Sequence, residues 1–291
     1  MKIDINKQIT NFIVYCTKVQ KNPATIKAYT LDLRQYTAFV DDILDSNSIK
    51  KFIAHLQKTY KCKSVKKKIA VLKLFYKYMF DKKIISDNPF FKIASIKDPV
   101  MEPKIVPLDV PQKILKKVYE DITATSSNTY TQKTIIMHAA MFELLINTGL
   151  KITEICDLKI DDIDFKKELI YVRSPNCRQR TIKISDKKIK HALEQYKTAR
   201  KDIIQNDSNK NYFFINRFKR KVAHQSVQNS ITEYAQRAGY IKPITPNMLR
   251  HTLAVRLLKE NPQNIVQVKE MFGHGSIITT EKYLNLSQKK S

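Results

Sequence analysis

The sequence predicts a mostly helical protein of two domains with a small β part. Its 291 residues are enough to form two hydrophobic cores. Apolar residues recur at helical spacing over most of the chain, whereas strict alternation of apolar and polar residues, which is typical of strands, is confined to a few short segments. Residues 88–110 contain four prolines and little periodicity. We therefore expect a helical domain at residues 1–97, a linker at residues 98–110 and a second domain at residues 111–291.

Four helices are expected in the first domain, because four apolar stripes follow one another at intervals of mostly three and four residues. The stripes are Ile5, Ile9, Phe12 and Cys16; Tyr29, Leu33, Tyr36 and Val40; Ile49, Phe52, Ile53 and Leu56; and Val65, Ile69, Leu72, Tyr76 and Met79. Side chains at such spacing share one face of a helix. We interpret all four stripes as core.

Lysines crowd the segment that leads into the fourth of these helices. The cluster consists of Lys58, Lys61, Lys63, Lys66, Lys67 and Lys68. Helix N-termini and lysine side chains both suit phosphate groups, so we interpret the last five as contacts to a DNA backbone rather than as a solvated face. The chain carries 53 Lys and Arg against 27 Asp and Glu, a net charge of +26 that is shared by both halves. Such a balance is typical of proteins that bind nucleic acid.

The β part of the second domain is expected to be a hairpin. Residues 168–173 and 180–185 alternate in polarity and are rich in β-branched side chains, and residues 174–179 supply the turn. A further short strand is expected at residues 212–215 and a polar loop at residues 123–131. The remainder of this domain is expected to be helical.

The last third of the chain holds the candidate chemistry. Thr245 and Pro246 have the character of an N-cap and a first helical residue, which places Asn247 and Arg250 one turn apart on one helix face. A second helix, with Ile265, Val268, Met271 and Phe272 at helical spacing, is expected to stop at Gly273. His274 follows that stop directly. Residues 279–281 predict another helix start, so that Tyr283 lies in its first turn or on an adjoining loop.

These side chains suit phosphoryl transfer without a metal. Arg250 can grip two phosphate oxygens with its planar fork of donors, and His274 can donate one more hydrogen bond as charge develops. The phenol of Tyr283 can then attack phosphorus and hold the cut strand end as a phosphotyrosine, which conserves the energy of the bond for rejoining. The ordered spacing of the three residues therefore points to a tyrosine nucleophile that acts on a DNA phosphate.

Three strings carry a resemblance to a known family: TGLKITEICDLKIDDID, LRHTLAVRLL and MFGHGSIITTEKYL. Together they resemble the tyrosine recombinase (phage integrase) family, and most of all its short Xer-like type. Residues 25–89 are similar to that family's helical core-binding domain. The resemblance implies an N-terminal four-helix core-binding (SAM-like) domain, a mixed α/β catalytic domain that breaks and rejoins DNA, and a 3′-phosphotyrosine intermediate.

The family's motif residues can be placed on this sequence one at a time. Its second arginine falls on Arg250, its late histidine on His274 and its nucleophile on Tyr283. Its first arginine falls on Lys151, which keeps the positive charge and loses the bidentate fork. Its second-box histidine falls on Asn247, which can donate a hydrogen bond but cannot shuttle a proton near neutral pH.

The family's hairpin turn carries a lysine that protonates the leaving 5′ oxygen, and the matching position here is Pro175. Proline has no proton to give. Arg173, Arg178 and Arg180 lie close by and are expected to bind phosphate, but arginine is a poor proton donor because its pKa exceeds about 12. Lys183 is the nearest lysine downstream, on a strand rather than in the turn. Glu154 is expected to orient the helix that begins near Lys151 or to pair with a cation there.

Two functions from different classes follow. The first is a site-specific recombinase or integrase that cuts and rejoins DNA strands through Tyr283. The second is a recombinase-derived DNA-binding accessory protein with weak or no cleavage activity. The departures from the family pattern at Lys151, Pro175 and Asn247 favour the second. A relaxing activity like that of a type IB topoisomerase is a third reading. Double-stranded DNA is the expected partner, with self-association as a dimer or tetramer and a possible partner recombinase.

The remaining features set limits. Only eight residues follow Tyr283, so we expect subunits to contact one another through their N-terminal domains rather than by exchange of a C-terminal helix. The four cysteines, Cys16, Cys62, Cys156 and Cys177, lie far apart without metal-type spacing, and we expect no metal and no other cofactor. Neither a signal peptide nor a long apolar run occurs, so a cytoplasmic protein is expected.

Overall fold

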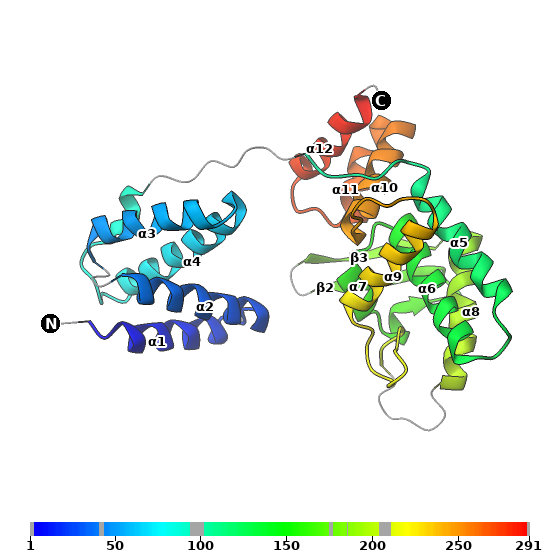
Figure 1. Cartoon of the computed structure of the whole chain (residues 1–291), viewed down its shortest axis with the longest axis horizontal. Coiled ribbons are helices and arrows are strands. Elements are labelled where there is room, and N and C mark those ends of the chain that lie inside the picture. The colour runs from blue at the N-terminus through cyan, green and yellow to red at the C-terminus, as the bar shows by residue number, and fades with distance from the viewer. Residues whose placement is uncertain are drawn as a thin grey trace. The chain divides into compact units, whose positions relative to one another are not determined.

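The computed structural model describes residues 3–40, 44–93, 102–174, 177–184, 186–203 and 211–289; of residues 92, 174, 177, 178, 202 and 203 it describes the backbone alone. The chain divides into two compact units, Met1–Met101 and Glu102–Ser291. Both are built mainly from helices, and the second also contains a small sheet (Figure 1). The expected fold class is confirmed. The division between the units lies within the segment expected to be a linker, residues 98–110.

The described residues of the first unit form four helices and one short 3-10 turn. They are α1 (Ile5–Lys18), α2 (Pro23–Phe39), α3 (Ser46–Thr59), α4 (Cys62–Asp81) and η1 (Pro89–Lys92). Asp4, Asn22 and Asp45 cap the first three helices, each accepting a hydrogen bond from a backbone N–H in the first turn. The four predicted stripes pack into one core, in which Ile5, Tyr29 and Ile53 are partly buried at the margin.

A polar contact between two tyrosines lies within the core of this unit. The hydroxyl groups of Tyr36 on α2 and Tyr76 on α4 lie 2.7 Å apart and are both enclosed by apolar side chains. A buried hydroxyl must find a partner to avoid a desolvation penalty, and these two satisfy each other. The contact fixes the register of α2 against α4.

The second unit contains the remaining helices. They are α5 (Val110–Ala124), α6 (Tyr130–Asn147), α7 (Ile152–Asp157), η2 (Ile160–Asp162), α8 (Lys187–Ile203), α9 (His224–Arg237), α10 (Pro246–Glu260), η3 (Pro262–Asn264), α11 (Ile265–Phe272) and α12 (Ile277–Gln288). Nearly the whole C-terminal half of α6 is buried, and α5, α8, α9 and α10 all pack against this helix. Helix α6 is therefore the centre of the unit.

A three-stranded antiparallel sheet flanks these helices, in the order β1 (Ile163–Asp164), β2 (Leu169–Ser174) and β3 (Cys177–Lys183). Ile170 pairs with Ile182 and both are buried, while Thr181, which precedes Ile182 on β3, is exposed, as the predicted alternation requires. The hairpin is confirmed, but its strands reach further toward the turn than expected, to Ser174 and from Cys177. Pro175 lies outside the described residues.

The strand expected at residues 212–215 does not form. Tyr212 makes one bridge to Lys159 and Ile215 makes another to Lys221, so the two ends of the segment pair with different partners and no ladder develops. Phe213 and Phe214 between them are buried and pack against Tyr196 of α8. Aromatic packing, not pairing in a sheet, explains the apolar character of this segment.

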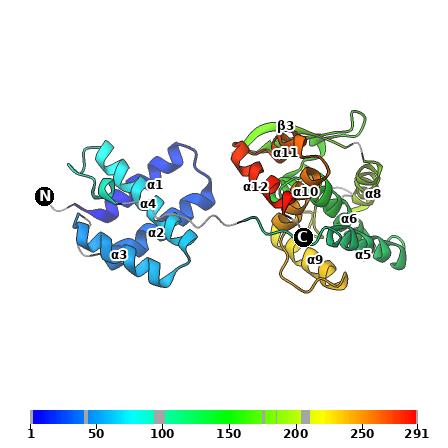
Figure 2. The same cartoon turned by 90° about the horizontal axis from the view of Figure 1, so that it is seen from above.

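Helices α10, α11 and α12 gather at one end of the second unit, as two perpendicular views show (Figures 1 and 2). Their apolar faces form a separate small core that contains Leu253, Val268, Phe272 and Tyr283. None of the described helices is long and apolar enough to cross a membrane.

Candidate active site

The first turn of α10 presents two of the predicted residues. The Thr245 hydroxyl accepts a hydrogen bond from the backbone N–H of Met248 at 3.2 Å, and Pro246 occupies the first helical position, as the sequence predicts. Asn247 is exposed one turn before Arg250, which is 5% exposed. The first turn of α10 therefore exposes the side-chain amide of Asn247 to solvent and buries the guanidinium of Arg250.

The guanidinium of Arg250 joins three segments. Nη1 donates a hydrogen bond to the carbonyl oxygen of Gly149, and Nη2 donates one to the carbonyl oxygen of Phe272 at 2.5 Å. The guanidinium carbon also lies 4.5 Å from the centre of the Phe272 ring. Because these contacts come from the loop before α7 and from the end of α11, the position of the cation is fixed before any ligand arrives.

Gly149 permits this arrangement. Its φ of +65° lies in the left-handed region, and a Cβ atom added there would come within 2.7 Å of the Phe272 ring. Only glycine satisfies both the backbone conformation and the close approach. The sequence analysis did not single out Gly149, although the dipeptide Thr148-Gly149 after a long apolar helix signals a helix stop.

Helix α11 ends at Gly273, as predicted, with a φ of +64°. The backbone N–H of His274 then donates to the carbonyl oxygen of Lys269, and the His274 ring turns toward α12. There Nδ1 shares a hydrogen bond of 3.0 Å with the hydroxyl of Thr280, a side chain that is fully buried. Thr280 therefore fixes the orientation of the imidazole, a role that sequence reasoning missed.

Burial lowers the pKa of His274 to about 4, and the positive charges of Arg250 and Lys151 act in the same direction. The imidazole is consequently neutral at pH 7. A neutral imidazole has one nitrogen that donates and one that accepts, so this residue can exchange a proton or donate a hydrogen bond without bringing a charge.

Tyr283 lies beside this histidine. The two rings stack at 5.9 Å with an angle of 21° between their planes, and the ring of His251 lies 5.5 Å away on another side. Tyr283 is 5% exposed, and burial raises the pKa of its phenol while Arg250 opposes the rise. The phenol is therefore protonated near neutral pH and must lose its proton when it reacts.

Helix α12 begins earlier than expected. Ser276 caps the helix by accepting a hydrogen bond from the backbone N–H of Ile278, so Tyr283 lies in the second turn instead of the first. The expectation of a start near residues 279–281 was wrong, because a serine that follows Gly275 caps as well as the threonines do. The earlier start gives Thr280 and Tyr283, three residues apart, the same helix face toward His274.

Glu154 organises the start of α7. It accepts two hydrogen bonds from the guanidinium of Arg180, at 2.9 and 2.7 Å, and a third from the backbone N–H of Lys151 at 2.8 Å. Burial alone would raise the pKa of Glu154, but these hydrogen bonds outweigh it and the pKa is lowered. The ammonium of Lys151 lies 4.0 Å from the same carboxylate. Glu154 thus pairs with a cation, as the sequence analysis expected.

Arg180 was expected to bind phosphate, and the structure assigns its donors elsewhere. Besides the two bonds to Glu154, Nε donates to the carbonyl oxygen of Met271 at 3.0 Å, and the side chain is only 9% exposed. A buried cation that is matched by a buried carboxylate has its charge already compensated. Arg180 therefore braces β3 against α7 and α11, and a contact from Arg180 to DNA stays a prediction.

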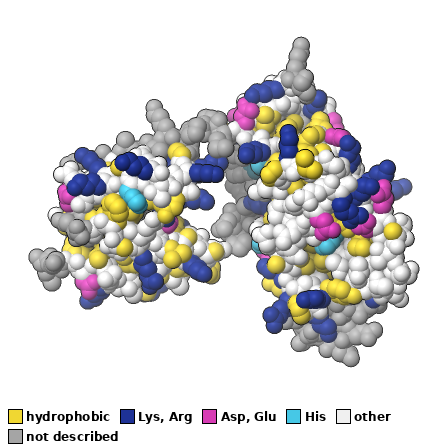
Figure 3. All heavy atoms as spheres, viewed as in Figure 1, with side chains coloured by type: hydrophobic (Ala, Val, Ile, Leu, Met, Phe, Trp, Pro, Cys, Tyr) yellow, Lys and Arg dark blue, Asp and Glu magenta, His cyan; other side chains and the backbone are white. Residues whose placement is uncertain are grey.

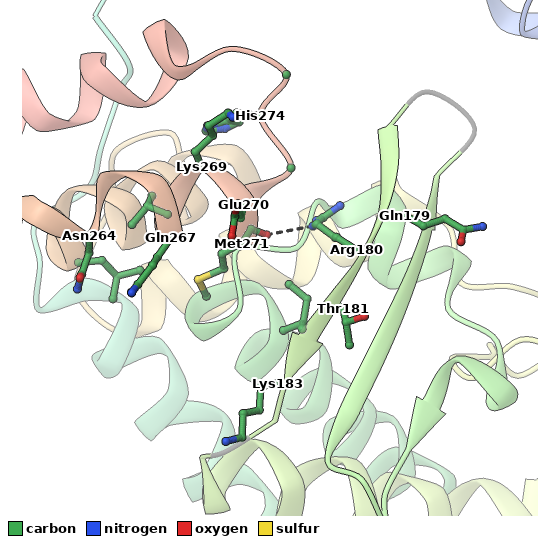
Figure 4. A pocket seen from close by; sticks show the side chains of 15 residues that line it. Gln179, Arg180, Thr181, Lys183, Asn264, Gln267, Lys269, Glu270, Met271 and His274 are labelled. Carbon is green, nitrogen blue, oxygen red and sulfur yellow. Dashed lines mark hydrogen bonds between the residues drawn. The ribbon is translucent and has the colours of Figure 1, made fainter.

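A cavity of about 1080 Å³ opens between β3 and α11. Figure 4 shows His274 and Lys269 at one end, Lys183 at the other and Arg180 between them, bonded to Met271. Among the described residues no group of His, Cys, Asp and Glu is arranged to hold a metal ion.

The lysine cluster of the first unit is divided by the structure. Lys61, Lys63 and Lys67 are exposed and Lys66 is partly exposed around the start of α4. Lys68 differs, because its ammonium lies 2.6 Å from both Asp32 and Gln35 of α2 and 5.0 Å from the centre of the Tyr60 ring. A lysine so engaged braces α4 against α2, and its contact with DNA stays a prediction.

The remaining predicted contacts lie on the hairpin. Arg173 is 61% exposed and pairs with Asp162 at 2.9 Å, while the side chain of Arg178, like that of Cys177, lies outside what the structure describes. The other cysteines, Cys16, Cys62 and Cys156, are free thiols. Lysine and arginine side chains are spread over both units on the face shown in Figure 3.

Comparison with known proteins gives this arrangement a family. Residues 112–290 match the model of the phage integrase family, and residues 9–86 match that of the phage integrase N-terminal SAM-like domain. The chain belongs to the phage integrase family, whose members are tyrosine recombinases. The resemblance carried by the three strings is confirmed over nearly the whole chain.

Individual relatives agree with this assignment. A tyrosine recombinase of Agathobacter rectalis is 33% identical over 99% of this chain and 94% of its own length. Tyrosine recombinase XerD of Listeria innocua is 31% identical over 91% of this chain and 88% of its own. Among solved structures, XerH recombinase bound to a palindromic difH substrate has the same fold, with a TM-score of 0.73 at 16% identity, over 90% of this chain and 76% of that one.

Proposed function

We propose that this protein is a site-specific DNA recombinase that cuts and rejoins DNA strands through a covalent bond between Tyr283 and a 3′ phosphate. One observation carries the proposal: the Tyr283 ring is stacked on His274, next to a guanidinium of Arg250 that Gly149 and Phe272 hold in place. A nucleophile, a proton-exchanging group and a preorganised cation are the components that phosphoryl transfer without a metal requires.

Each residue takes a definite part. The phenolic oxygen of Tyr283 attacks phosphorus, the bond to the 5′ oxygen breaks, and the strand end remains on the enzyme until the 5′ hydroxyl of another strand reverses the reaction. Arg250 and Lys151 stabilise the charge that spreads over the phosphate oxygens. Neutral His274 donates a hydrogen bond to the phosphate, and Asn247, exposed at the start of α10, supplies a further donor.

Double-stranded DNA is held by charge from both units. Its phosphates are bound by lysines around the start of α4, namely Lys61, Lys63, Lys66 and Lys67, and by the hairpin arginines Arg173 and Arg178. Affinity therefore falls steeply as salt rises. Two solved relatives of the same fold are XerH bound to difH and a lambda integrase dimer bound to a core site. We propose self-association on DNA, as a dimer or tetramer, and a cytoplasmic location that suits the free thiols.

Covalent trapping tests the proposal. The protein is incubated with nicked DNA from its own genetic neighbourhood and denatured in detergent, and a protein–DNA adduct is sought. The adduct is expected with the wild-type chain and with the control Tyr240→Phe, whose ring lies at the edge of the main core, and is expected to be absent in Tyr283→Phe. A mobility shift must show that all three bind the same DNA.

Two outcomes contradict the proposal. An adduct in Tyr283→Phe means that another residue is the nucleophile. No adduct with the wild-type chain, when binding is confirmed, favours the alternative of a DNA-binding accessory protein, which the substitutions at Lys151 and Asn247 would then explain.

A further inference from the structure

Strand cleavage has a second requirement besides the nucleophile. When the bond between phosphorus and the 5′ oxygen breaks, the departing alkoxide must gain a proton, because an unprotonated alkoxide is a poor leaving group near neutral pH. A group in the site must therefore hold an acidic proton close to the phosphate. The candidates for this group are the described side chains around His274.

Most of these side chains lack a suitable proton. The two histidines are neutral at pH 7, since burial lowers the pKa of both His274 and His251. The two arginines, Arg250 and Arg180, carry guanidinium groups, which keep their protons even in strong base. Asn247 has an amide, which does not transfer protons in this range. The ammonium group of a lysine is the stronger acid, by about two pKa units or more relative to arginine.

Lys151 is the lysine whose position suits the task. The carbonyl oxygen of Gly149 accepts a hydrogen bond from Arg250, and Lys151 lies two residues after Gly149. The backbone of Lys151 is therefore within about 7 Å of this hydrogen bond. Its positive charge acts on His274 together with that of Arg250. A phosphate gripped by Arg250 and His274 is consequently within reach of the Lys151 side chain.

The pair of Arg180 and Glu154 allows the ammonium to move. Arg180 occupies the carboxylate of Glu154 with two short hydrogen bonds, whereas the Lys151 ammonium lies 4.0 Å from it and is 39% exposed. If Lys151 turns toward a phosphate, Glu154 keeps a matched cation and no buried charge is stranded. The backbone N–H of Lys151 meanwhile remains bonded to Glu154 and holds the residue in place.

We propose that Lys151 is the proton donor for the leaving 5′ oxygen, an inference that rests on the proposed function. In cleavage, the bond between the Tyr283 oxygen and phosphorus forms, the bond to the 5′ oxygen breaks, and that oxygen takes a proton from the Lys151 ammonium. The proton released by the phenol restores the ammonium through solvent. In rejoining, the steps reverse. The Lys151 ammonium first returns a proton to solvent, its neutral amine then accepts the proton of the attacking 5′ hydroxyl, and the departing Tyr283 phenolate takes up a proton from solvent.

A substrate that needs no acid tests this role. The position of cleavage is first mapped with the wild-type chain, and a duplex is then made with sulfur in place of the bridging 5′ oxygen at that phosphate. A thiolate leaves without protonation. Lys151→Arg keeps the charge and loses the acid, so its cleavage of the ordinary duplex should fall by about 10²–10⁴-fold, whereas its cleavage of the sulfur duplex should stay within about tenfold of wild type.

Lys183 and Lys269 line the cavity between β3 and α11 and serve as matched controls. Lys183→Arg on β3 and Lys269→Arg on α11 should cleave both duplexes at similar relative rates. Lys151→Ala, which loses charge as well as acid, should be impaired on both duplexes and more strongly on the ordinary one. Tyr283→Phe should cleave neither.

The results separate the two proposals. If Lys151→Arg loses the same factor on both duplexes, Lys151 acts through charge alone and the inference is wrong. If the selective rescue by sulfur occurs in Lys183→Arg or Lys269→Arg instead, the acid is that lysine. If the wild-type chain forms no adduct with bound DNA, the proposed function itself fails.

Discussion

Gly149 links stability to the geometry of the candidate site, and Gly149→Ala tests that link. An alanine at a φ of +65° carries a backbone strain of about 1–2 kcal/mol. Its Cβ atom would also meet two atoms of the Phe272 ring at 2.7 and 2.8 Å, about 1 Å inside the optimum for carbon atoms. Phe272 is fully buried, so the ring cannot move away into solvent.

The backbone strain and the clash with Phe272 both lower the free energy of unfolding, and their contributions add. Overpacking of a buried site typically destabilises by about 1–3 kcal/mol, so Gly149→Ala should lower the free energy of unfolding by about 2–5 kcal/mol in total. Gly239→Ala is the matched control: its φ is +85°, but nothing lies within 4 Å of the added Cβ, and it should lose only the 1–2 kcal/mol of strain. Urea unfolding followed by circular dichroism measures both.

The same variant should impair cleavage. The carbonyl oxygens of Gly149 and Phe272 both accept hydrogen bonds from Arg250, so displacement of the ring shifts the cation that would grip the phosphate. A misplacement near 1 Å lowers a rate by about 10²-fold. Equal destabilisation by the two alanines, or wild-type adduct formation by Gly149→Ala, would show that the close approach to Phe272 does not position Arg250.

Two further predictions concern charges. Arg180→Met should lower the free energy of unfolding by about 3–5 kcal/mol, because it leaves the buried carboxylate of Glu154 without its cation. The double variant that also carries Glu154→Met should lose less stability than Arg180→Met alone. Urea unfolding measures both, and a loss below about 1 kcal/mol in Arg180→Met would contradict the pairing. The unfolding free energy of the wild-type chain should fall as pH drops from about 6.5 toward 4, because the unfolded chain takes up protons that the buried His274 and His138 do not take up in the folded state. His274→Gln should reduce this dependence, and His138 should keep its share. An unchanged slope in His274→Gln would place the titration on another group.

Local patterns explain which parts of the fold could be predicted from the sequence. The stripes of α1 to α4, the stop of α11 at Gly273 and the β2–β3 hairpin each follow from residues within a few positions of one another. The segment at residues 212–215 was misread because a run of buried aromatic residues has the composition of a strand whether or not a partner strand lies beside it.

The contacts that shape the site join residues far apart in the chain, which explains why sequence reasoning missed them. Arg250 and Gly149 are 101 positions apart, and Lys68 and Asp32 are 36 apart. Before the fold is known, Lys68 is indistinguishable from its neighbours Lys67 and Lys66. Spacing identifies a lysine on a helix, and only the packing of α2 against α4 shows that this one is engaged.

Without DNA, the positive charges of Arg250 and Lys151 lie close together at the candidate site and repel each other. Burial lowers the pKa of His274, and Arg250 and Lys151 act in the same direction because their positive charges repel a further positive charge on the imidazole. A bound phosphate brings a compensating negative charge, which raises the pKa of His274 again and strengthens the hydrogen bond that His274 donates to the phosphate. The same phosphate attracts the ammonium of Lys151 away from Glu154, whose charge Arg180 continues to match. Substrate binding would therefore bring the two proton-carrying groups, imidazole and ammonium, into their working positions together.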